Sequence, residues 1–191
     1  MNGGPTTASS LPSPAADGEE VVIEVENLAV SYGDHLALKE VALEVRRGGV
    51  SVIVGGSGSG KTTLLKAIIG LAPISSGRIR LLDRELGKLT EAEGRALLQR
   101  IGVMFQGGAL LNSITVGENV ALPLEMHSSL KTDLVAEIAR TRLRLVGLED
   151  AADKLPAELS GGMRKRAALA RAMAMDPEIL LVDEVLAVGD A

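Results

Sequence analysis

The chain has 191 residues, a formal net charge of −5 and no cysteine, and 46% of its residues are hydrophobic. This composition indicates a globular α/β protein of one domain, or one large domain cut short, and the acidic balance argues against a general affinity for nucleic acid. The lack of cysteine excludes disulfides and cysteine-based metal sites, and no apolar run reaches the roughly 18 to 20 residues that a membrane span needs.

The N-terminal part predicts a tail followed by strands. Residues 1–19 are mostly small and polar and hold three of the seven prolines, which predicts a disordered tail. Alternating apolar residues predict a strand over 21–33, turning at Gly33, and a second strand over 38–49. The segment VSVIV, residues 50–54, is apolar on both faces and predicts a central buried strand.

The middle and C-terminal parts alternate between helical and strand patterns. Leu and Ile at helical spacing predict a helix over 61–71, and Pro73 and Gly77 are expected to interrupt the pattern before a strand over 78–82. Thr90 and Glu93 form a capping-box pattern. The further elements expected are helices over 90–99, 131–148 and 160–175, helical structure from about 117, and apolar strands over 101–105 and 178–184.

The segment GGSGSGKT, residues 55–62, matches the phosphate-loop pattern G-x-x-x-x-G-K-[ST]. Its glycines let backbone N–H groups approach phosphate oxygens, and the following helix adds the positive end of its dipole. A flexible Gly-Ser turn is the alternative, but a strand before and a helix after favour the phosphate loop. The nucleotide-binding residues expected here are Gly55, Gly56, Ser57, Gly58, Ser59, Gly60, Lys61, Thr62 and Thr63, with Lys61 on the β and γ phosphates and the Thr62 hydroxyl on Mg²⁺.

Two adjacent carboxylates, Asp183 and Glu184, follow the apolar run ILLV. Ligands of open parallel sheets bind beyond the carboxyl ends of the strands, so Asp183 is placed to hold Mg²⁺ through water. Glu184 faces the other way and can accept a proton from an attacking water. A strand-end carboxylate that caps the next turn is the alternative. Together with the phosphate loop, the pair indicates a nucleoside triphosphatase.

The segment LSGGM, residues 159–163, stands at a predicted helix start, 23 residues before Asp183. Ser160 and the N–H groups of Gly161 and Gly162 can form a second anion site there. The segment resembles the signature L-S-G-G-[QM] of the ABC-transporter ATPase family. The resemblance implies that ATP is held between the phosphate loop of one subunit and this segment of a second copy.

The same resemblance assigns two further residues. Gln106, in VMFQGG, matches the family's Q-loop, where the glutamine touches Mg²⁺ and the attacking water and the loop contacts the membrane partner. Tyr32, in VSYGD, matches the aromatic residue that stacks on adenine. An ordinary turn residue and a tyrosine packed on the sheet are the respective alternatives.

The family resemblance covers about residues 20–191 and implies an ABC-ATPase domain with an antiparallel β subdomain and a helical subdomain at about 107–158. It implies a cytoplasmic ATPase held at the inner face of the plasma membrane by an integral-membrane permease. ATP and Mg²⁺ are the expected cofactors, a second copy of the chain the expected partner, and no nucleic acid is expected to bind. Glu184, Lys61 and Gln106 are the expected catalytic residues, and Thr62, Gln106 and Asp183 the expected metal site.

Residues 52–71, 101–127 and 145–172 resemble the ATPase subunits of Mla-type (MCE) phospholipid transporters, which predicts lipid transport. The last residues, DEVLAVGDA, resemble instead the ATPases of polysaccharide or teichoic-acid exporters, because Val185 stands where most of the family has proline. Asp190 matches the D-loop aspartate in either case.

The chain ends before the position of the family's switch histidine, so we expect a C-terminally truncated ABC domain. Three alternatives stay open: a polysaccharide-exporter ATPase, an ATP-binding module without efficient hydrolysis, and a soluble ABC protein of translation or DNA repair. The last usually carries two cassettes or a long coiled-coil insertion, and the sequence has neither.

Overall fold

The computed structural model describes residues 20–183, which form two compact units divided between Leu97 and Leu98. The expected tail at 1–19 and the residues from Glu184 onward lie outside the described part. Among residues 20–183, no helix is both long and apolar enough to cross a bilayer.

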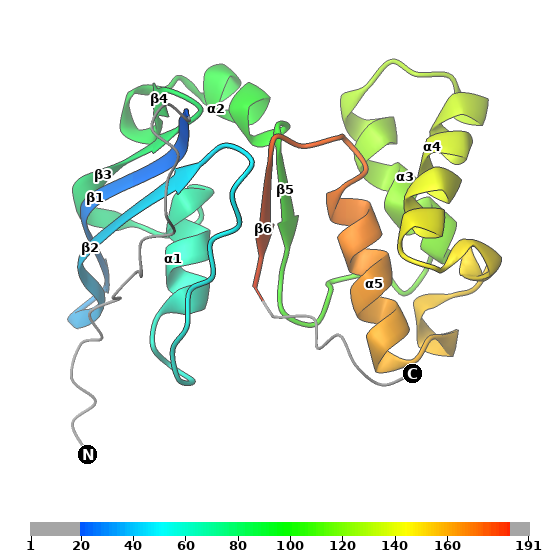
Figure 1. Ribbon diagram of the computed structural model, residues 1–191, viewed down its shortest axis with the longest axis horizontal. Helices are drawn as coiled ribbons and strands as arrows, with labels where there is room; N and C mark the ends of the chain where they lie inside the picture. Colours follow the sequence, from blue (N-terminus) through cyan, green and yellow to red (C-terminus); the bar gives the residue numbers. More distant parts are fainter. Residues whose placement is uncertain (1–19, 184–191) are drawn as a thin grey trace. The chain divides into compact units, whose positions relative to one another are not determined.

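The first unit is built on an antiparallel sheet with strand order β2-β1-β3-β4 (Figure 1). The alternating pattern of the sequence explains β1, since Val25, Leu28 and Val30 are buried while residues between them are less so. The alternating strands at 21–33 and near 38–49 are therefore confirmed, with shifted bounds. The strands are β1 Val21–Tyr32, β2 His35–Arg46, β3 Ile74–Leu81 and β4 Arg84–Glu85.

Strand β3 begins at Ile74, earlier than the predicted start at 78. Gly77 was expected to break the pattern, but it lies inside the strand with φ 87°. A Cβ at this position would come within 2.5 Å of the carbonyl oxygens of Glu26 and Asn27. The glycine therefore allows a bulge against β1, where the register shifts between Glu26 and Ala29.

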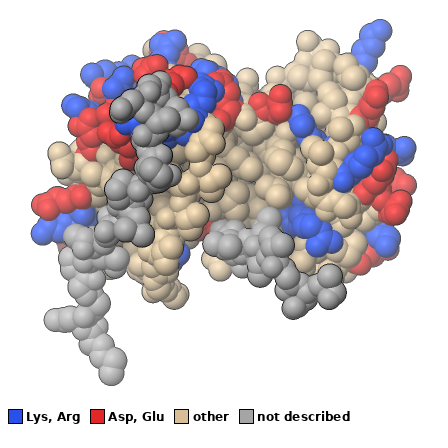
Figure 2. Space-filling model, viewed as in Figure 1, with Lys and Arg blue, Asp and Glu red and all other residues tan. Residues whose placement is uncertain are grey.

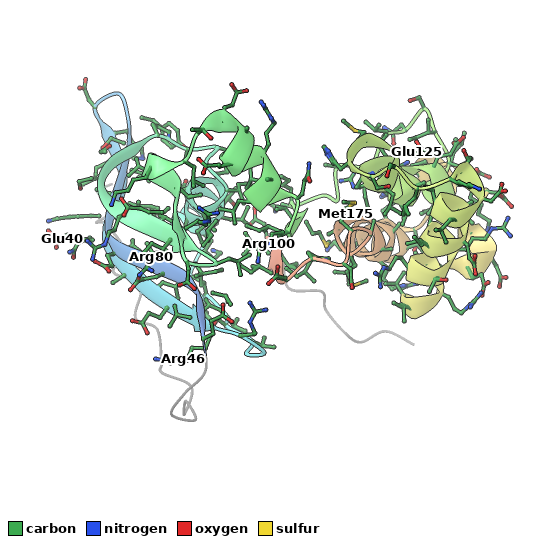
Figure 3. The ribbon with its side chains drawn as sticks, turned by 90° about the horizontal axis from the view of Figure 1, so that it is seen from above. Glu40, Arg46, Arg80, Arg100, Glu125 and Met175 are labelled. Carbon is green, nitrogen blue, oxygen red and sulfur yellow. The ribbon has the colours of Figure 1, made fainter. Side chains whose placement is uncertain are left out.

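The sheet carries intermixed charges on its more exposed side. Arg80 pairs with Glu24 at 2.9 Å and Arg78 with Glu26 at 2.5 Å, in both cases across β3 and β1. Figure 2 shows acidic and basic side chains interspersed over this part of the molecule, and Figure 3 labels Arg80 on the sheet. Such cross-strand pairs suit a strand face that water reaches.

Helix α1, Lys61–Ile68, follows the glycine-rich segment 55–60 and buries Leu64, Leu65 and Ile68. The predicted helix over 61–71 is three residues too long, because Gly70 adopts φ 74°. The Gly70 N–H donates to the Ala67 carbonyl at 3.0 Å and the Leu71 N–H to the Lys66 carbonyl at 2.7 Å. These two bonds form a Schellman motif, which ends the helix.

The predicted central strand over 50–54 is wrong. These residues have no strand assignment and lie outside both described sheets, and Val50 and Val54 are 88% and 87% exposed. An apolar strand is stable only when neighbours satisfy its backbone groups and cover its side chains. In the sheet of the first unit, β2 and β4 are the edge strands, and residues 50–54 pair with neither of them.

The second unit combines three packed helices with a two-stranded parallel sheet, and Figure 1 shows α5 beside β5. The helical core contains Val116, Val120, Leu143 and Ala167, all fully buried. The strands at 101–105 and 178–184 and the helices from about 117, over 131–148 and over 160–175 are confirmed with shifted bounds, except that residue 184 lies outside the described part. The elements are β5 Ile101–Met104, α3 Val116–His127, α4 Thr132–Leu145, α5 Gly161–Ala172 and β6 Ile179–Val182.

Strand β6 is less buried than predicted. Leu180 and Val182 are exposed, and only Ile179 is buried. In the described part β6 pairs with β5 alone, so its other edge has no ladder partner there. The two strands are also joined where they begin, because the Arg100 guanidinium donates to the Glu178 carboxylate at 2.6 Å. Arg100 is labelled in Figure 3.

Gly102 lets strand β5 approach the end of α5 closely. A Cβ on this residue would collide with the Ala172 carbonyl oxygen and come within 2.9 Å of Cγ of Pro177. The absence of a side chain therefore sets the distance between this sheet and its helix.

The helix ends follow local sequence signals. Helix α2, Glu91–Leu98, begins with the predicted capping box: the Thr90 N–H donates to the Glu93 carboxylate at 2.9 Å and the Glu93 N–H to the Thr90 hydroxyl at 3.3 Å. Thr115 and Glu118 make the same arrangement at the start of α3. Short 3₁₀ helices at Leu86–Lys88, Glu149–Ala151 and Pro156–Glu158 complete the described elements.

Candidate functional site

Residues 55–60 of the predicted phosphate loop lie directly before α1 in the first unit, and the remaining predicted residues, 61–63, form the first turn of that helix. Lys61 stands at the first helical position, and its ammonium group donates to the carbonyl oxygens of Gly55 at 2.6 Å and Gly56 at 2.8 Å. It also donates to the Ser59 hydroxyl at 3.2 Å. The Lys61 side chain therefore lies against the loop that precedes it. An anion bound at this loop would contact the Lys61 ammonium group.

Glycine is required at Gly60, and at Gly55 any larger residue would have to displace the Ser59 side chain. Gly60, the N-cap residue of α1, has φ 88°, and a Cβ there would lie 2.6 Å from Cδ2 of Leu38. A Cβ on Gly55 would lie 2.6 Å from the Ser59 hydroxyl. Gly60 offers no side chain to cap the helix, and the first turn of α1 holds no acidic residue. The start of α1 therefore combines a left-handed glycine, a lysine and a first turn without acidic residues, which are features that favour an anion.

Tyr32 lies at the end of β1 in the same unit and is 46% exposed. It pairs with His35 across the hairpin, three residues before Leu38, whose side chain contacts the Gly60 position. Three residues of a strand span about 10 Å, so the hairpin carries an exposed aromatic ring to the neighbourhood of the phosphate loop.

Gln106 and Asp183 follow the carboxyl ends of β5 and β6, at the same edge of the parallel sheet in the second unit. Met104 pairs with Val182 at the carboxyl ends of β5 and β6, and the Asp183 N–H donates to the Met104 carbonyl at 2.8 Å. Gln106 follows in an exposed turn. The structure thus brings these two predicted residues to one sheet edge, as expected for parallel strands.

The signature residues stand at the start of α5. Ser160 is the N-cap residue, and its hydroxyl accepts from the Met163 N–H at 3.2 Å. Gly161 and Gly162 form the exposed first turn, which holds no acidic residue. Leu159 is buried below them and fixes the segment to the helical core.

Two residues that the sequence analysis did not single out hold the chain between Gln106 and α3. Asn119 is fully buried, and its amide oxygen accepts from the Leu111 N–H at 2.7 Å while its nitrogen donates to the Leu111 carbonyl at 2.9 Å. Arg171 donates to the carbonyl oxygens of Gly108 and Ala109. The signal that could have indicated Asn119 is its position as a polar residue among the apolar residues of α3. Arg171 has no comparable signal in the sequence.

The remaining predicted residues, Glu184 and Asp190, lie outside the described residues. Of the predicted metal ligands, Thr62 lies in the first turn of α1 in the first unit, and Gln106 and Asp183 lie in the second. No group of three or more His, Asp or Glu side chains within residues 20–183 could hold a metal ion. The three predicted residues offer hydroxyl, amide and carboxylate oxygens, which are the donor types that suit Mg²⁺.

The chain belongs to the ABC transporter family, whose model matches residues 38–187. Its sequence is 42% identical over 163 residues to the intermembrane phospholipid transport system ATP-binding protein MlaF of Haemophilus influenzae, covering 85% of this chain and 62% of that protein. It is 40% identical over 169 residues to the methionine import ATP-binding protein MetN of Clostridium tetani, covering 88% of this chain and 53% of that protein. The chain thus spans less than two thirds of the length of these curated relatives.

The fold is also that of solved ABC cassettes. The dimeric post-hydrolysis structure of the ATP-binding cassette MJ0796, bound to ADP and Pi, has a TM-score of 0.78 and 32% sequence identity, covering 85% of this chain and 73% of that one. The ABC-ATPase fold class, with its antiparallel sheet and its helices, is therefore confirmed.

Proposed function

We propose that the chain is the ATP-binding and ATP-hydrolysing part of an ABC transporter subunit. The observation that carries the proposal is the first turn of α1, where a glycine N-cap, a first turn without acids and the Lys61 ammonium group meet. This arrangement suits the triphosphate of ATP, since each feature favours negative charge. The ADP and Pi in the MJ0796 structure support it by analogy.

In the proposed reaction the phosphate loop, with Lys61, holds and stabilises the phosphates, and Tyr32 stacks on adenine. Glu184 accepts the proton of the attacking water. Thr62, Gln106 and Asp183 would hold Mg²⁺ through their oxygen atoms, and the ion would supply positive charge to the phosphates. Ser160, Gly161 and Gly162 meet the ATP of a second copy of the chain, and Asp190 acts at the D-loop.

The test is the substitution Glu184→Gln in the full-length protein. It keeps the size of the side chain but removes the proton acceptor, so we expect ATP binding to persist and turnover to be lost. Fluorescent-nucleotide titration and phosphate release measure the two. Turnover equal to that of the wild type would remove Glu184 from the role of base, and a wild type that neither binds nor hydrolyses ATP would contradict the proposed function.

Phospholipid is the substrate class we propose, with the ATPase held at the inner face of the membrane by a permease. The resemblance to MlaF supports it, whereas MetN acts in methionine import. ATP-driven transfer of fluorescent phospholipid between vesicles that contain the full-length protein and a phospholipid-transporter permease tests it. Transport of methionine instead would contradict it. Transport of a polysaccharide is the second candidate, favoured by Val185 in DEVLAVGDA.

A further inference from the structure

The loop after Gln106 has an unusual backbone. Gly107, Gly108 and Ala109 have φ angles of 80°, 78° and 46°, so three successive residues lie in the left-handed region. Alanine seldom adopts this conformation, because its Cβ approaches the backbone. Such a conformation persists only where surrounding contacts hold it.

Helix α5 supplies these contacts from one side. The Arg171 guanidinium donates through Nη1 to the Ala109 carbonyl at 2.8 Å and through Nη2 to the Gly108 carbonyl at 2.9 Å. A Cβ on Gly108 would lie 3.0 Å from the Cβ of Ala168, one turn earlier on the same helix. The loop backbone is therefore pressed directly against α5.

Arg171 has an environment that an ordinary surface arginine lacks. Its partners within residues 20–183 are backbone carbonyls and no carboxylate. Burial lowers the pKa of its guanidinium, which indicates that the charge has lost much of its water. A desolvated arginine whose planar guanidinium donates to two successive backbone carbonyls holds that backbone in one conformation.

We propose that Arg171 is a positioning residue for Gln106. By joining the Gln106 loop to α5, it makes that loop and the helix that begins with the signature residues move together. The inference rests on the proposed function, since it gives Gln106 a part in ATP hydrolysis. Asn119 fixes the other end of the segment at Leu111, so the loop is held at two points.

The first measurement is hydrogen exchange of residues 106–111 in the nucleotide-free protein. We expect faster exchange in Arg171→Ala and an intermediate rate in Arg171→Lys, because an ammonium group cannot reproduce the planar fork. Arg144→Ala is the matched control, since it removes an exposed arginine of α4 that pairs with Glu149. Slow exchange retained in Arg171→Ala would overturn the inference.

The second measurement is a double-mutant cycle with Gln106→Ala. If Arg171 acts through Gln106, Arg171→Ala lowers kcat by about 10- to 100-fold with little change in KM for ATP, and the double variant is no slower than Gln106→Ala. Arg144→Ala should leave kcat unchanged. Effects of Arg171→Ala and Gln106→Ala that multiply, or a kcat unaffected by Arg171→Ala, would overturn the positioning role.

The two measurements also separate this inference from the proposed function. A wild-type protein without ATP turnover contradicts the proposed function, and hydrogen exchange then still decides whether Arg171 holds the loop. A wild type that hydrolyses ATP, with unchanged exchange in Arg171→Ala, leaves the proposed function standing and overturns the inference.

Discussion

The first turns of helices α2 and α3 contain acidic residues, whereas the first turns of α1 and α5 contain none. In α3 the Glu118 carboxylate accepts from the Thr115 N–H and the Thr115 hydroxyl from the Glu118 N–H, while backbone carbonyls accept from the next two N–H groups. In α1 the N-cap is Gly60, which offers no side chain, and in α5 Ser160 supplies a single hydroxyl. A carboxylate satisfies a helix start internally, so its absence leaves the positive end available to an external anion.

The largest effect that this comparison predicts is at Lys61. Lys61→Ala should weaken ATP binding by about 10- to 100-fold, because a charge-assisted contact to phosphate is lost. Stability should change by no more than about 0.5 kcal/mol, because the bonds of Lys61 to Gly55 and Gly56 are exposed. Titration with a fluorescent ATP analogue and thermal unfolding measure the two.

Lys66→Ala is the matched control for that experiment, since Lys66 is an exposed lysine in the last turn of the same helix. It should bind ATP as the wild type does. Equal losses in the two variants would mean that general positive charge on α1, and not the position of Lys61, attracts the nucleotide.

A second substitution converts the start of α5 into that of α3. Met163→Glu places a carboxylate three residues after Ser160, which reproduces the Thr115 and Glu118 pair. We expect ATP turnover to fall about tenfold, because the new charge repels the triphosphate and occupies the helix start, while α5 stays folded. Phosphate release and circular dichroism measure these outcomes.

Met163→Gln serves as the control, since it removes the same partly buried apolar side chain without adding charge. It should keep more turnover than Met163→Glu. An equal loss in both variants would attribute the effect to packing or to capping of the helix start, and not to the added charge.

The smallest predicted effect concerns pH. Hydrogen bonds from the Thr115 backbone and hydroxyl hold the pKa of Glu118 below its ordinary value of 4.5. A carboxylate whose pKa is lower in the folded state stabilises the protein above that ordinary value, and this contribution is lost as the pH falls below it. We therefore expect the Tm to decline below about pH 4.5, and to decline less in Glu118→Gln.

Scans of Tm between pH 3 and 7 check this prediction. Salt should weaken the pH effect only modestly, since Glu118 is held by hydrogen bonds at contact distance. Identical pH profiles for the wild type and Glu118→Gln would show that this capping box contributes nothing to acid sensitivity.

Local signals in the sequence predicted most elements of the fold. The alternation of 21–33, the capping pattern of Thr90 and Glu93 and the glycine-rich loop at 55–60 each depend on neighbouring residues alone, and the structure contains each of them. The sheet edge at Gln106 and Asp183 was also predictable, because both follow the carboxyl ends of parallel strands.

What depended on distant partners was not predictable. Residues 50–54 have the composition of a buried strand, but burial requires neighbouring strands that a local pattern cannot supply. The exposed side chains of β6 have the same cause. Arg171 resembles any helical arginine in the sequence, and only the fold shows that it lies against the loop at Gly108.

Gly102 affects how the results of a substitution scan of this protein are interpreted. In a scan of all single substitutions, this position should reject every side chain, because even alanine would separate β5 from the end of α5. It is not among the residues assigned to nucleotide or metal, so its intolerance would reflect assembly of the sheet and helix. A map of sensitive positions in this protein would therefore mix positions that serve ATP with positions that serve only the spacing between layers, and Gly102 is a reference point for telling them apart.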